Sequence, residues 1–264
     1  MPVHNHPASE ADTGLRAPLA EIFTSIQGEA LFAGVQQVFV RFRGCDLRCP
    51  WCDTPAAYEL EGDCWCQTRP GVRGWTIANP VAVSDAADVV RRIVKAGEPG
   101  AIHSISITGG EPLLYPDYVA ALAAELRPLN LPIMLETNGQ RPDDLRRVLR
   151  AVDWIAADFK LDSALGRPLD GDARAEFLRL AQSKRAFVKI VLTDAATEGE
   201  LAGVFALIAA TDPCCPVFLQ PVTPTGGIRP PRGLDLLRYR ELAVRAGLRD
   251  VRVMPQIHRL LGLP

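Results

Sequence analysis

The chain has 264 residues, of which 48% are hydrophobic and 23% charged, and its 29 basic and 31 acidic side chains give a net charge of −2. This length fits one α/β domain or two small ones, with enough apolar residues for a substantial core. The balanced charge excludes the overall basic excess that indicates general nucleic-acid binding, so we expect no nucleic-acid partner. No apolar run approaches the ~20 residues needed to span a bilayer, so we expect no membrane association and a cytoplasmic protein.

Residues 1–18 are polar and lack the basic start and apolar core of a signal peptide, and we predict a disordered tail there. The remainder, residues 19–264, is predicted to form a single domain. Its seven cysteines are an odd number, which argues for metal binding or catalysis and against a disulfide framework.

The regular elements follow in chain order. Residues 37–44 form an apolar run that we interpret as a strand, and residues 55–83 are predicted to be an irregular insertion rich in Gly, Pro and Trp. Helical spacing of apolar residues then predicts helices over 84–95 (with Ser84 as the cap), 115–126, 142–149, 173–182, 197–210 and 234–246. Short buried strands are predicted between them, over 103–108, 132–136, 153–158, 186–192, 216–220 and 251–254.

This alternation indicates a parallel sheet with helices outside. Six βα units and a last strand are fewer than a closed barrel needs, so the fold class is α/β, a partial, open (β/α)6 TIM-like barrel. Functional groups gather at the carboxyl ends of the strands in such folds. Polar residues do follow the predicted strands, at 43–45, 108–111, 136–139, 158–160, 193–194, 220–223 and 255–258.

The most informative motif is Cys45-Asp-Leu-Arg-Cys49-Pro-Trp-Cys52. Three thiolates bind three irons of a four-iron cluster and leave the fourth iron open, whereas a ferredoxin cluster uses four cysteines. A zinc site would need a fourth ligand at regular spacing. The x3 and x2 spacing, with an aromatic residue before the third cysteine, resembles the cluster motif of the radical S-adenosylmethionine (SAM) superfamily. The glycines of Thr108-Gly-Gly-Glu111-Pro, which let backbone approach a ligand closely, support this resemblance.

Further motifs narrow the resemblance. The chain has Glu21-Ile-Phe-Thr-Ser-Ile-Gln-Gly-Glu29, Cys-Asp-Thr at 52–54, Glu-Thr-Asn-Gly at 136–139 and Met254-Pro-Gln-Ile-His258. Together these resemble the 7-carboxy-7-deazaguanine synthase family over residues 21–264. The resemblance implies a radical SAM lyase that contracts the ring of 6-carboxy-5,6,7,8-tetrahydropterin to give 7-carboxy-7-deazaguanine, on the route to queuosine and related 7-deazapurines.

The resemblance also implies the cofactors and their residues. They are a [4Fe–4S] cluster on Cys45, Cys49 and Cys52, S-adenosyl-L-methionine, and Mg²⁺ on Thr54, since magnesium prefers oxygen ligands. Where many members have Ser-Pro-Lys, this chain has Asp158-Phe159-Lys160, and we expect the carboxylate to bind SAM hydroxyls. The full set of expected SAM-binding residues is Gly110, Glu111, Asp158, Phe159, Lys160, Gln220, Pro221, Val222 and Thr223.

The substrate-binding residues implied by the family are Ile26, Gln27, Gly28, Glu29, Arg41, Thr108 and Pro264, with Glu136 and His258 as catalytic candidates. Arg41 would hold the substrate carboxylate, although strand alternation sends Arg41 and Arg43 to the same face and does not choose between them. The other thiols, Cys64, Cys66, Cys214 and Cys215, are expected to be structural or incidental, because Cys64 and Cys66 alone are too few ligands for a second metal site.

Partners and alternatives complete the predictions. The family resemblance implies a small-molecule pterin substrate, a reductant protein of flavodoxin or ferredoxin type, and a homodimer. One alternative is an activase for a glycyl-radical enzyme, which shares the cysteine triplet but needs neither chain-end motif. Another is a non-catalytic metal-cluster or electron-carrier module, which predicts a fourth cysteine or histidine ligand and no Gly-Gly-Glu-Pro loop.

Overall fold

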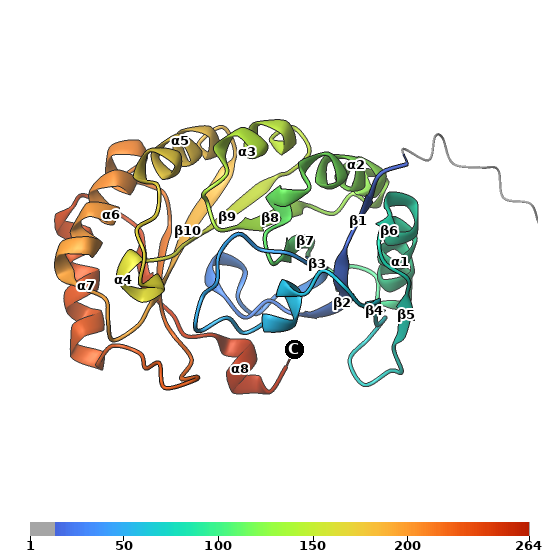
Figure 1. Ribbon diagram of the computed structural model, residues 1–264, viewed down its shortest axis with the longest axis horizontal. Helices are drawn as coiled ribbons and strands as arrows, with labels where there is room; N and C mark the ends of the chain where they lie inside the picture. The colour runs from blue at the N-terminus through green and yellow to red at the C-terminus, as the bar shows by residue number, and fades with distance from the viewer. Residues whose placement is uncertain (1–13, 264) are drawn as a thin grey trace, which may run out of the picture.

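One curved sheet organises the protein. The computed structural model describes residues 14–263, and over these residues ten strands form a sheet in the order β12-β11-β10-β9-β8-β7-β3-β2-β4-β5. The seven strands from β3 to β12 run parallel to one another. Figure 1 shows the sheet bent into an arc with helices along its outer face, and its end strands β12 and β5 do not pair.

The parallel strands are β3 (Gln36–Phe42), β7 (Ser104–Gly109), β8 (Ile133–Thr137), β9 (Trp154–Phe159), β10 (Arg185–Leu192), β11 (Val217–Pro221) and β12 (Val251–Val253). The helices that connect them are α1 (Val83–Ala96), α2 (Pro116–Leu126), α3 (Pro142–Val148), α5 (Gly171–Ala181), α6 (Glu198–Thr211) and α7 (Gly233–Arg245). Two short helices, α4 (Asp162–Leu165) and α8 (Ile257–Leu261), lie in the segments that follow β9 and β12. The predicted open (β/α)6 partial barrel is therefore confirmed.

The predicted boundaries of these strands and helices lie within two residues of the observed ones. One local prediction was wrong. Helix α1 begins at Val83, and Ala82 occupies its cap position without a side-chain hydrogen bond, so Ser84 lies inside the helix. Ser84 lies two residues after the cap position, so its hydroxyl cannot cap the free N–H groups of the first turn.

Three strands on the side of β3 away from β7 were not predicted from the sequence. Strand β2 (Leu19–Ile26) pairs antiparallel with β3, and the hairpin of β4 (Cys64–Cys66) and β5 (Trp75–Ile77) extends the sheet beyond it. Residues 55–83 are therefore partly regular, and Cys64 and Cys66 are buried in the core. The tail expected over 1–18 falls largely outside the described residues, except that β1 (Arg16–Ala17) pairs with β6 (Val81–Ala82).

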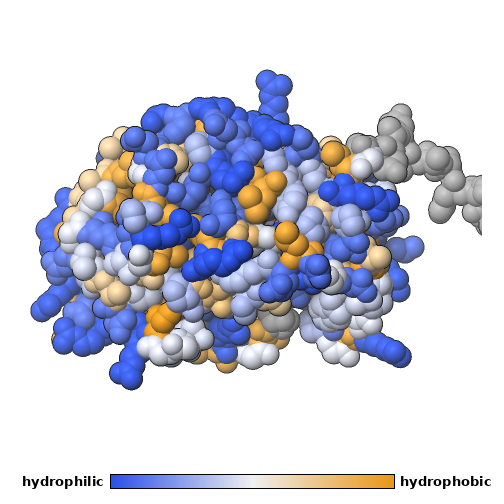
Figure 2. All heavy atoms as spheres, viewed as in Figure 1, coloured by the Kyte–Doolittle hydropathy of each residue, from blue (hydrophilic) through white to orange (hydrophobic). Residues whose placement is uncertain are grey.

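The main core lies between the sheet and its helices, and a smaller cluster that includes Met134, Phe187 and Phe218 fills part of the concave face. Burying such side chains is the main favourable term in folding. Among residues 14–263, no helix is both long and apolar enough to cross a membrane. The face drawn in Figure 2 is mostly hydrophilic, with apolar side chains in separate small patches.

Candidate active site

A cavity of about 360 Å³ lies at the carboxyl ends of the parallel strands, inside the arc. Ligand sites of α/β barrels form at this end of the sheet, where the connecting loops meet. Most residues expected to bind ligands line it: Ile26, Gln27, Gly28, Glu29, Arg41, Cys45, Cys49, Cys52, Thr54, Thr108, Gly110, Glu136, Asp158, Lys160, Gln220, Val222, Thr223 and His258. Residues far apart in the sequence thus share one wall.

The loop after β3 brings Cys45, Cys49 and Cys52 into the cavity wall as free, half-buried thiols. The backbone N–H of Cys52 donates to the carbonyl of Cys49 at 3.0 Å, which closes a turn between them. Tyr58 fixes this loop, because its hydroxyl accepts from the Cys49 N–H at 3.2 Å and its ring lies 4.5 Å from the Arg48 guanidinium.

The thiols of this loop fit an iron–sulfur cluster better than a single ion. Within residues 14–263, no three His, Cys, Asp or Glu side chains converge as one metal ion requires. Thiolates that ligate a four-iron cluster bind different irons and need not converge on one point. Burial raises the pKa of Cys45 to about 12 and also raises that of Cys49, so bound iron is what would favour their thiolate forms.

The glycine loop after β7 packs directly against the cysteine loop. A Cβ on Gly110 would lie 1.8 Å from the carbonyl oxygen of Gly44, and Gly109 has a φ of +135° with no room beside Phe42. The N–H of Glu111 donates to that same Gly44 carbonyl at 2.7 Å. Only glycine allows this approach of two backbones, and it leaves Gly110 on the cavity wall.

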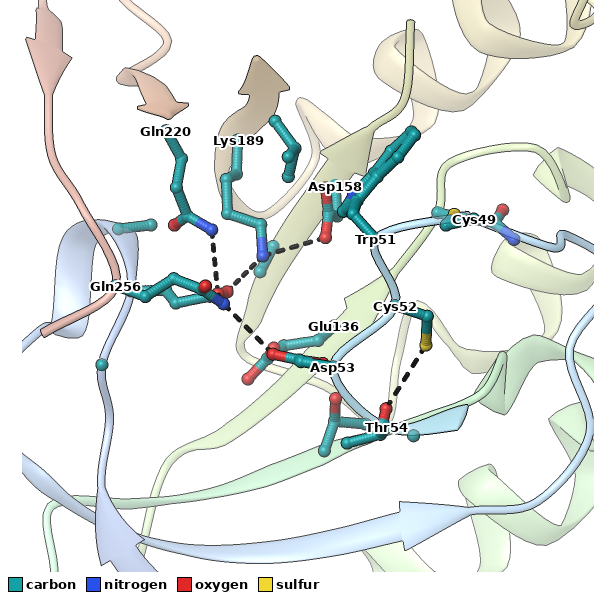
Figure 3. Close-up of a pocket in the computed structure, with 18 of the residues that line it drawn as sticks. Cys49, Trp51, Cys52, Asp53, Thr54, Glu136, Asp158, Lys189, Gln220 and Gln256 are labelled. Carbon is teal, nitrogen blue, oxygen red and sulfur yellow. Dashed lines mark hydrogen bonds and ion pairs between the residues drawn. The ribbon is translucent and has the colours of Figure 1, made fainter. Parts of the chain in front are cut away.

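A chain of alternating charges crosses the cavity wall (Figure 3). The Lys189 ammonium contacts Glu29 and lies 2.9 Å from Asp158 Oδ2, and Lys160 lies 2.6 Å from the same oxygen. Burial opposes ionisation of Glu29, but Lys189 and hydrogen bonds from Gln256 and Gln220 outweigh it and lower its pKa to about 2. The Glu29 carboxylate therefore stays ionised at neutral pH.

Two buried acceptors in this wall have no hydrogen-bond partner within the described residues, Asp158 Oδ1 and Gln220 Oε1. An unpaired buried acceptor is costly unless a ligand or water supplies a donor. The wall that holds both atoms thus suits a ligand with hydroxyl or ammonium donors. SAM carries both kinds of donor, so the residues present fit it.

Gln27 and Glu136 also line the cavity and belong to a buried polar network. The Gln27 amide nitrogen donates to Glu136 and to Gln37, each at 3.0 Å, and its amide oxygen accepts from the N–H of Glu29 at 3.1 Å. Ser106 donates to Glu136 at 2.6 Å. Burial raises the pKa of Glu136, and charged neighbours and the Ser106 bond only partly offset this rise.

Strand alternation did not distinguish Arg41 from Arg43 as the candidate for binding the substrate carboxylate, but their positions in the structure do. Arg41 lines the cavity, and among the described residues only its Nε is engaged, by Glu21 at 2.6 Å. Its two terminal nitrogens are left for a carboxylate, which a guanidinium binds bidentately. Arg43 lies after the end of β3 and donates to backbone carbonyls of the 56–63 segment, so it orders that segment and stays outside the cavity.

The C-terminal segment closes one side of the cavity. The N–H of Ile257 donates to the carbonyl of Gly28 at 2.9 Å, and the His258 ring fills the space where a Cβ of residue 28 would be. The Gln256 amide donates to Glu29 at 2.6 Å and to Asp53 at 3.1 Å. This segment therefore links the loop after β2 to the cysteine loop.

Three expected SAM-binding residues lie outside the cavity wall: Glu111, Phe159 and Pro221. The Glu111 carboxylate points into the protein, where it accepts from the N–H groups of Leu113 and Asn138 and from the Thr137 hydroxyl. Phe159 is fully buried in the core. Pro264 lies outside the described residues.

Other wall residues were missed from the sequence, above all Lys189, Gln256 and Asp53. Lys189 had a usable signal, because it is the one charge inside the apolar run 186–192. A charged side chain in a buried strand usually has a partner or a function.

Comparison with known proteins defines the class first. The model of the Radical SAM superfamily matches residues 39–188, which contain the cysteine and glycine loops. The solved structures support the same fold: the chain superposes on a crystal structure of QueE from Escherichia coli with a TM-score of 0.56 at 19% identity, covering 93% of this chain and 96% of that one. A radical SAM methyltransferase from Sphaerobacter thermophilus also gives 0.56, at 16% identity over 90% and 77%. The fold and the site are thus those of a radical SAM protein.

Sequence relatives define the family. The chain is 42% identical over 250 residues to 7-carboxy-7-deazaguanine synthase from Geobacter sulfurreducens, covering 93% of this chain and 97% of the relative. It is 32% identical to the protein of the same name from Methanothermobacter thermautotrophicus, covering 94% and 98%. The chain therefore belongs to the 7-carboxy-7-deazaguanine synthase family, and membership of the superfamily implies a [4Fe–4S] cluster and SAM as cofactors.

Proposed function

We propose that this chain converts 6-carboxy-5,6,7,8-tetrahydropterin into 7-carboxy-7-deazaguanine by a radical ring contraction with loss of ammonia, and so feeds queuosine and 7-deazapurine biosynthesis. The observation that carries the proposal is the 42% identity to the Geobacter synthase over 93% of the chain. An activase for a glycyl-radical enzyme would need neither the motif at residues 21–29 nor the motif at residues 254–258.

The cofactor side of the cavity would be formed by the two packed loops and the charged wall. Cys45, Cys49 and Cys52 would each bind one iron of the cluster, and Gly110 would contact SAM through its backbone. When bound, cluster and SAM supply the deoxyadenosyl radical that takes a hydrogen atom from the substrate. The remaining SAM contacts would come from Asp158, Lys160, Gln220, Val222 and Thr223, which line the same wall.

The substrate side would be formed by the loop after β2, β3 and the C-terminal segment. The terminal nitrogens of Arg41 would bind the substrate carboxylate, and Thr108 its neighbouring atoms. Glu136 would take up a proton from the substrate during ammonia loss, since burial keeps its pKa raised. His258 and the terminal Pro264 would cover the ring, while Ile26, Gln27, Gly28 and Glu29 would shape the site.

Three further elements of the proposal rest on the family resemblance. Thr54 lines the cavity beside the cysteine loop, and its hydroxyl would bind a Mg²⁺ that also touches the substrate. A flavodoxin- or ferredoxin-type protein would supply the electron. The working unit would be a homodimer.

Anaerobic reconstitution tests the proposal. The protein is loaded with iron and sulfide, then given SAM, a reductant and 6-carboxy-tetrahydropterin, and the products are analysed by mass spectrometry. We expect 7-carboxy-7-deazaguanine from the wild type and none from Cys49→Ser. SAM cleavage without this product, by protein with an intact cluster, would contradict the synthase and favour an activase.

A further inference from the structure

Lys189 occupies an unusual position in the sheet. It lies in the middle of β10 between Val188 and Ile190, which pack into the main core, and its own side chain points to the concave face with 8% exposure. A lysine buried to this extent needs a compensating charge. Here it has two, the carboxylates of Glu29 and Asp158. Figure 3 shows the contact between Lys189 and Asp158.

Four charged groups of this wall are joined by direct contacts, and the buried Glu136 carboxyl acts on Lys189 from farther away. Glu29, Lys189, Asp158 and Lys160 alternate in sign along these contacts, and two negative charges meet two positive ones. Burial by itself lowers the pKa of Lys189, but Asp158 and Glu29 outweigh it and hold that pKa well above its usual range. Lys189 therefore carries its positive charge at neutral pH.

The two ammonium groups also select which oxygen of Asp158 is used inside the protein. Lys160 and Lys189 both contact Oδ2, at 2.6 and 2.9 Å. Oδ1 is buried and has no partner among the described residues, although Asp158 lines the cavity. Without Lys189, the carboxylate loses one of the two contacts that fix its rotation, and one negative charge of the wall stays uncompensated.

We propose that Lys189 is a positioning residue for the cofactor: by engaging Asp158 Oδ2 and Glu29, it holds Asp158 Oδ1 as an acceptor for the hydroxyl or ammonium donors of SAM. The inference rests on the proposed function, because it takes SAM to be the ligand of this wall. It adds that Lys189 and Asp158 act as a matched pair. Removing both leaves Glu29 and Lys160 in balance, whereas removing Lys189 alone leaves an excess negative charge.

A double-mutant cycle of wild type, Lys189→Met, Asp158→Asn and the double variant tests the pair. Equilibrium dialysis measures SAM binding to cluster-reconstituted, unreduced protein, so no turnover is involved. We expect Lys189→Met to weaken SAM binding by at least about tenfold, the size of a lost charge-assisted contact. The double variant should bind SAM more tightly than Lys189→Met does, because the excess charge is gone. Lys189→Arg should keep most of the affinity.

Controls separate this role from a general effect on folding. Arg185→Met removes an exposed cation from the start of the same strand and should leave SAM binding unchanged. Urea unfolding of the metal-free variants gives a second readout, in which adding Asp158→Asn should recover part of the stability lost in Lys189→Met. If Lys189→Met does not fold, Lys189→Arg and the double variant carry the comparison.

The inference would be overturned if Lys189→Met bound SAM with wild-type affinity. It would also be overturned if the losses of SAM-binding free energy in the two single variants simply added in the double variant. The proposed function is judged separately, by product formation in the wild type. Product from the wild type together with an unperturbed Lys189→Met would leave the synthase standing and remove the role of Lys189. If the wild type made no product but Lys189 and Asp158 were coupled in SAM binding, the role of Lys189 would stand and the proposed synthase activity would fall.

Discussion

The side-chain amide of Gln27 holds the Glu136 carboxylate at 3.0 Å, across a gap of 109 residues in the sequence. Both amide hydrogens and the amide oxygen of Gln27 are engaged within the chain, by Glu136, Gln37 and the N–H of Glu29. The amide therefore orients Glu136, whereas the sequence placed Gln27 among the residues that bind the substrate. Substrate contacts of this loop are left to its other atoms.

The first prediction concerns Gln27→Leu, which keeps the side-chain volume and removes the donor to Glu136. We expect product formation at saturating SAM to fall by about 10- to 100-fold, since a lost hydrogen bond to a buried carboxylate costs roughly 1.5–3 kcal/mol. SAM binding should change little. Gln36→Leu is the matched control, because Gln36 donates to Thr24 and does not line the cavity. Equal losses in both variants would contradict the special role of Gln27.

The second prediction concerns Gly110→Ala. The added Cβ would lie 1.8 Å from the Gly44 carbonyl, so the glycine loop and the cysteine loop must move apart. Because small displacements in a preorganised site are costly, we expect SAM affinity to fall by at least about tenfold. Gly203→Ala in α6, where nothing lies within 4 Å of the new atom, serves as the control. Equilibrium dialysis measures both, and unchanged affinity in Gly110→Ala would argue against this contact.

The third prediction separates the cysteines. Cys45→Ser, Cys49→Ser and Cys52→Ser should each lose most of the reconstituted iron and sulfide, because each thiol is expected to bind a separate iron. Cys214→Ser should retain the wild-type content, since Cys214 is exposed and lies outside the cavity wall. Iron and sulfide analysis with electron paramagnetic resonance provides the measurement. Full cluster content in any of the three variants would remove that cysteine from the ligand set.

The parallel part of the fold could be predicted because its signals are local. Each βα unit carries its own apolar periodicity, so strands such as 186–192 and helices such as 197–210 were placed within two residues. Strand β2 was missed because its residues are buried or half-buried on both faces and show no alternation. Its antiparallel pairing with β3 across the 27–35 connection defines it, and the sequence of 19–26 carries no alternating pattern that would indicate this pairing.

The residues that line the cavity could be predicted where the spacing of a motif fixes how its loop is arranged. Cys45, Cys49, Cys52 and Gly110 lie in the cavity wall as their spacing indicates. The position of Glu111 outside the cavity wall was not predictable, because adjacency to Gly110 does not tell on which side of a loop a side chain leaves. Its carboxylate turns inward and accepts from three donors. Lys189 was missed because its meaning depends on Glu29 and Asp158, which only the fold brings to it.

The fourth prediction concerns pH. Burial lowers the pKa of His258, although Glu29 and Asp53 oppose the shift. Folding thus favours the neutral ring, and this contribution to stability is full above the unfolded value of about 6.5 and declines as the pH falls through it. Metal-free wild-type protein should therefore lose more unfolding free energy than His258→Asn between about pH 7.5 and pH 5.5. Urea titrations at both pH values test this, and parallel losses would contradict it.

The fifth prediction concerns Thr54 and magnesium. The Thr54 hydroxyl lies in the cavity wall, 3.8 Å from the Cys52 sulfur, so a cation bound there would sit beside the proposed cluster and the substrate carboxylate. We expect Thr54→Ala to lose the stimulation of product formation by Mg²⁺, by about tenfold for one lost oxygen ligand. Thr54→Ser keeps the hydroxyl and should keep most of the stimulation. Magnesium titrations of both variants, with SAM cleavage followed in parallel, distinguish a lost ligand from a damaged cluster. An unchanged magnesium response in Thr54→Ala would assign the cation to other groups.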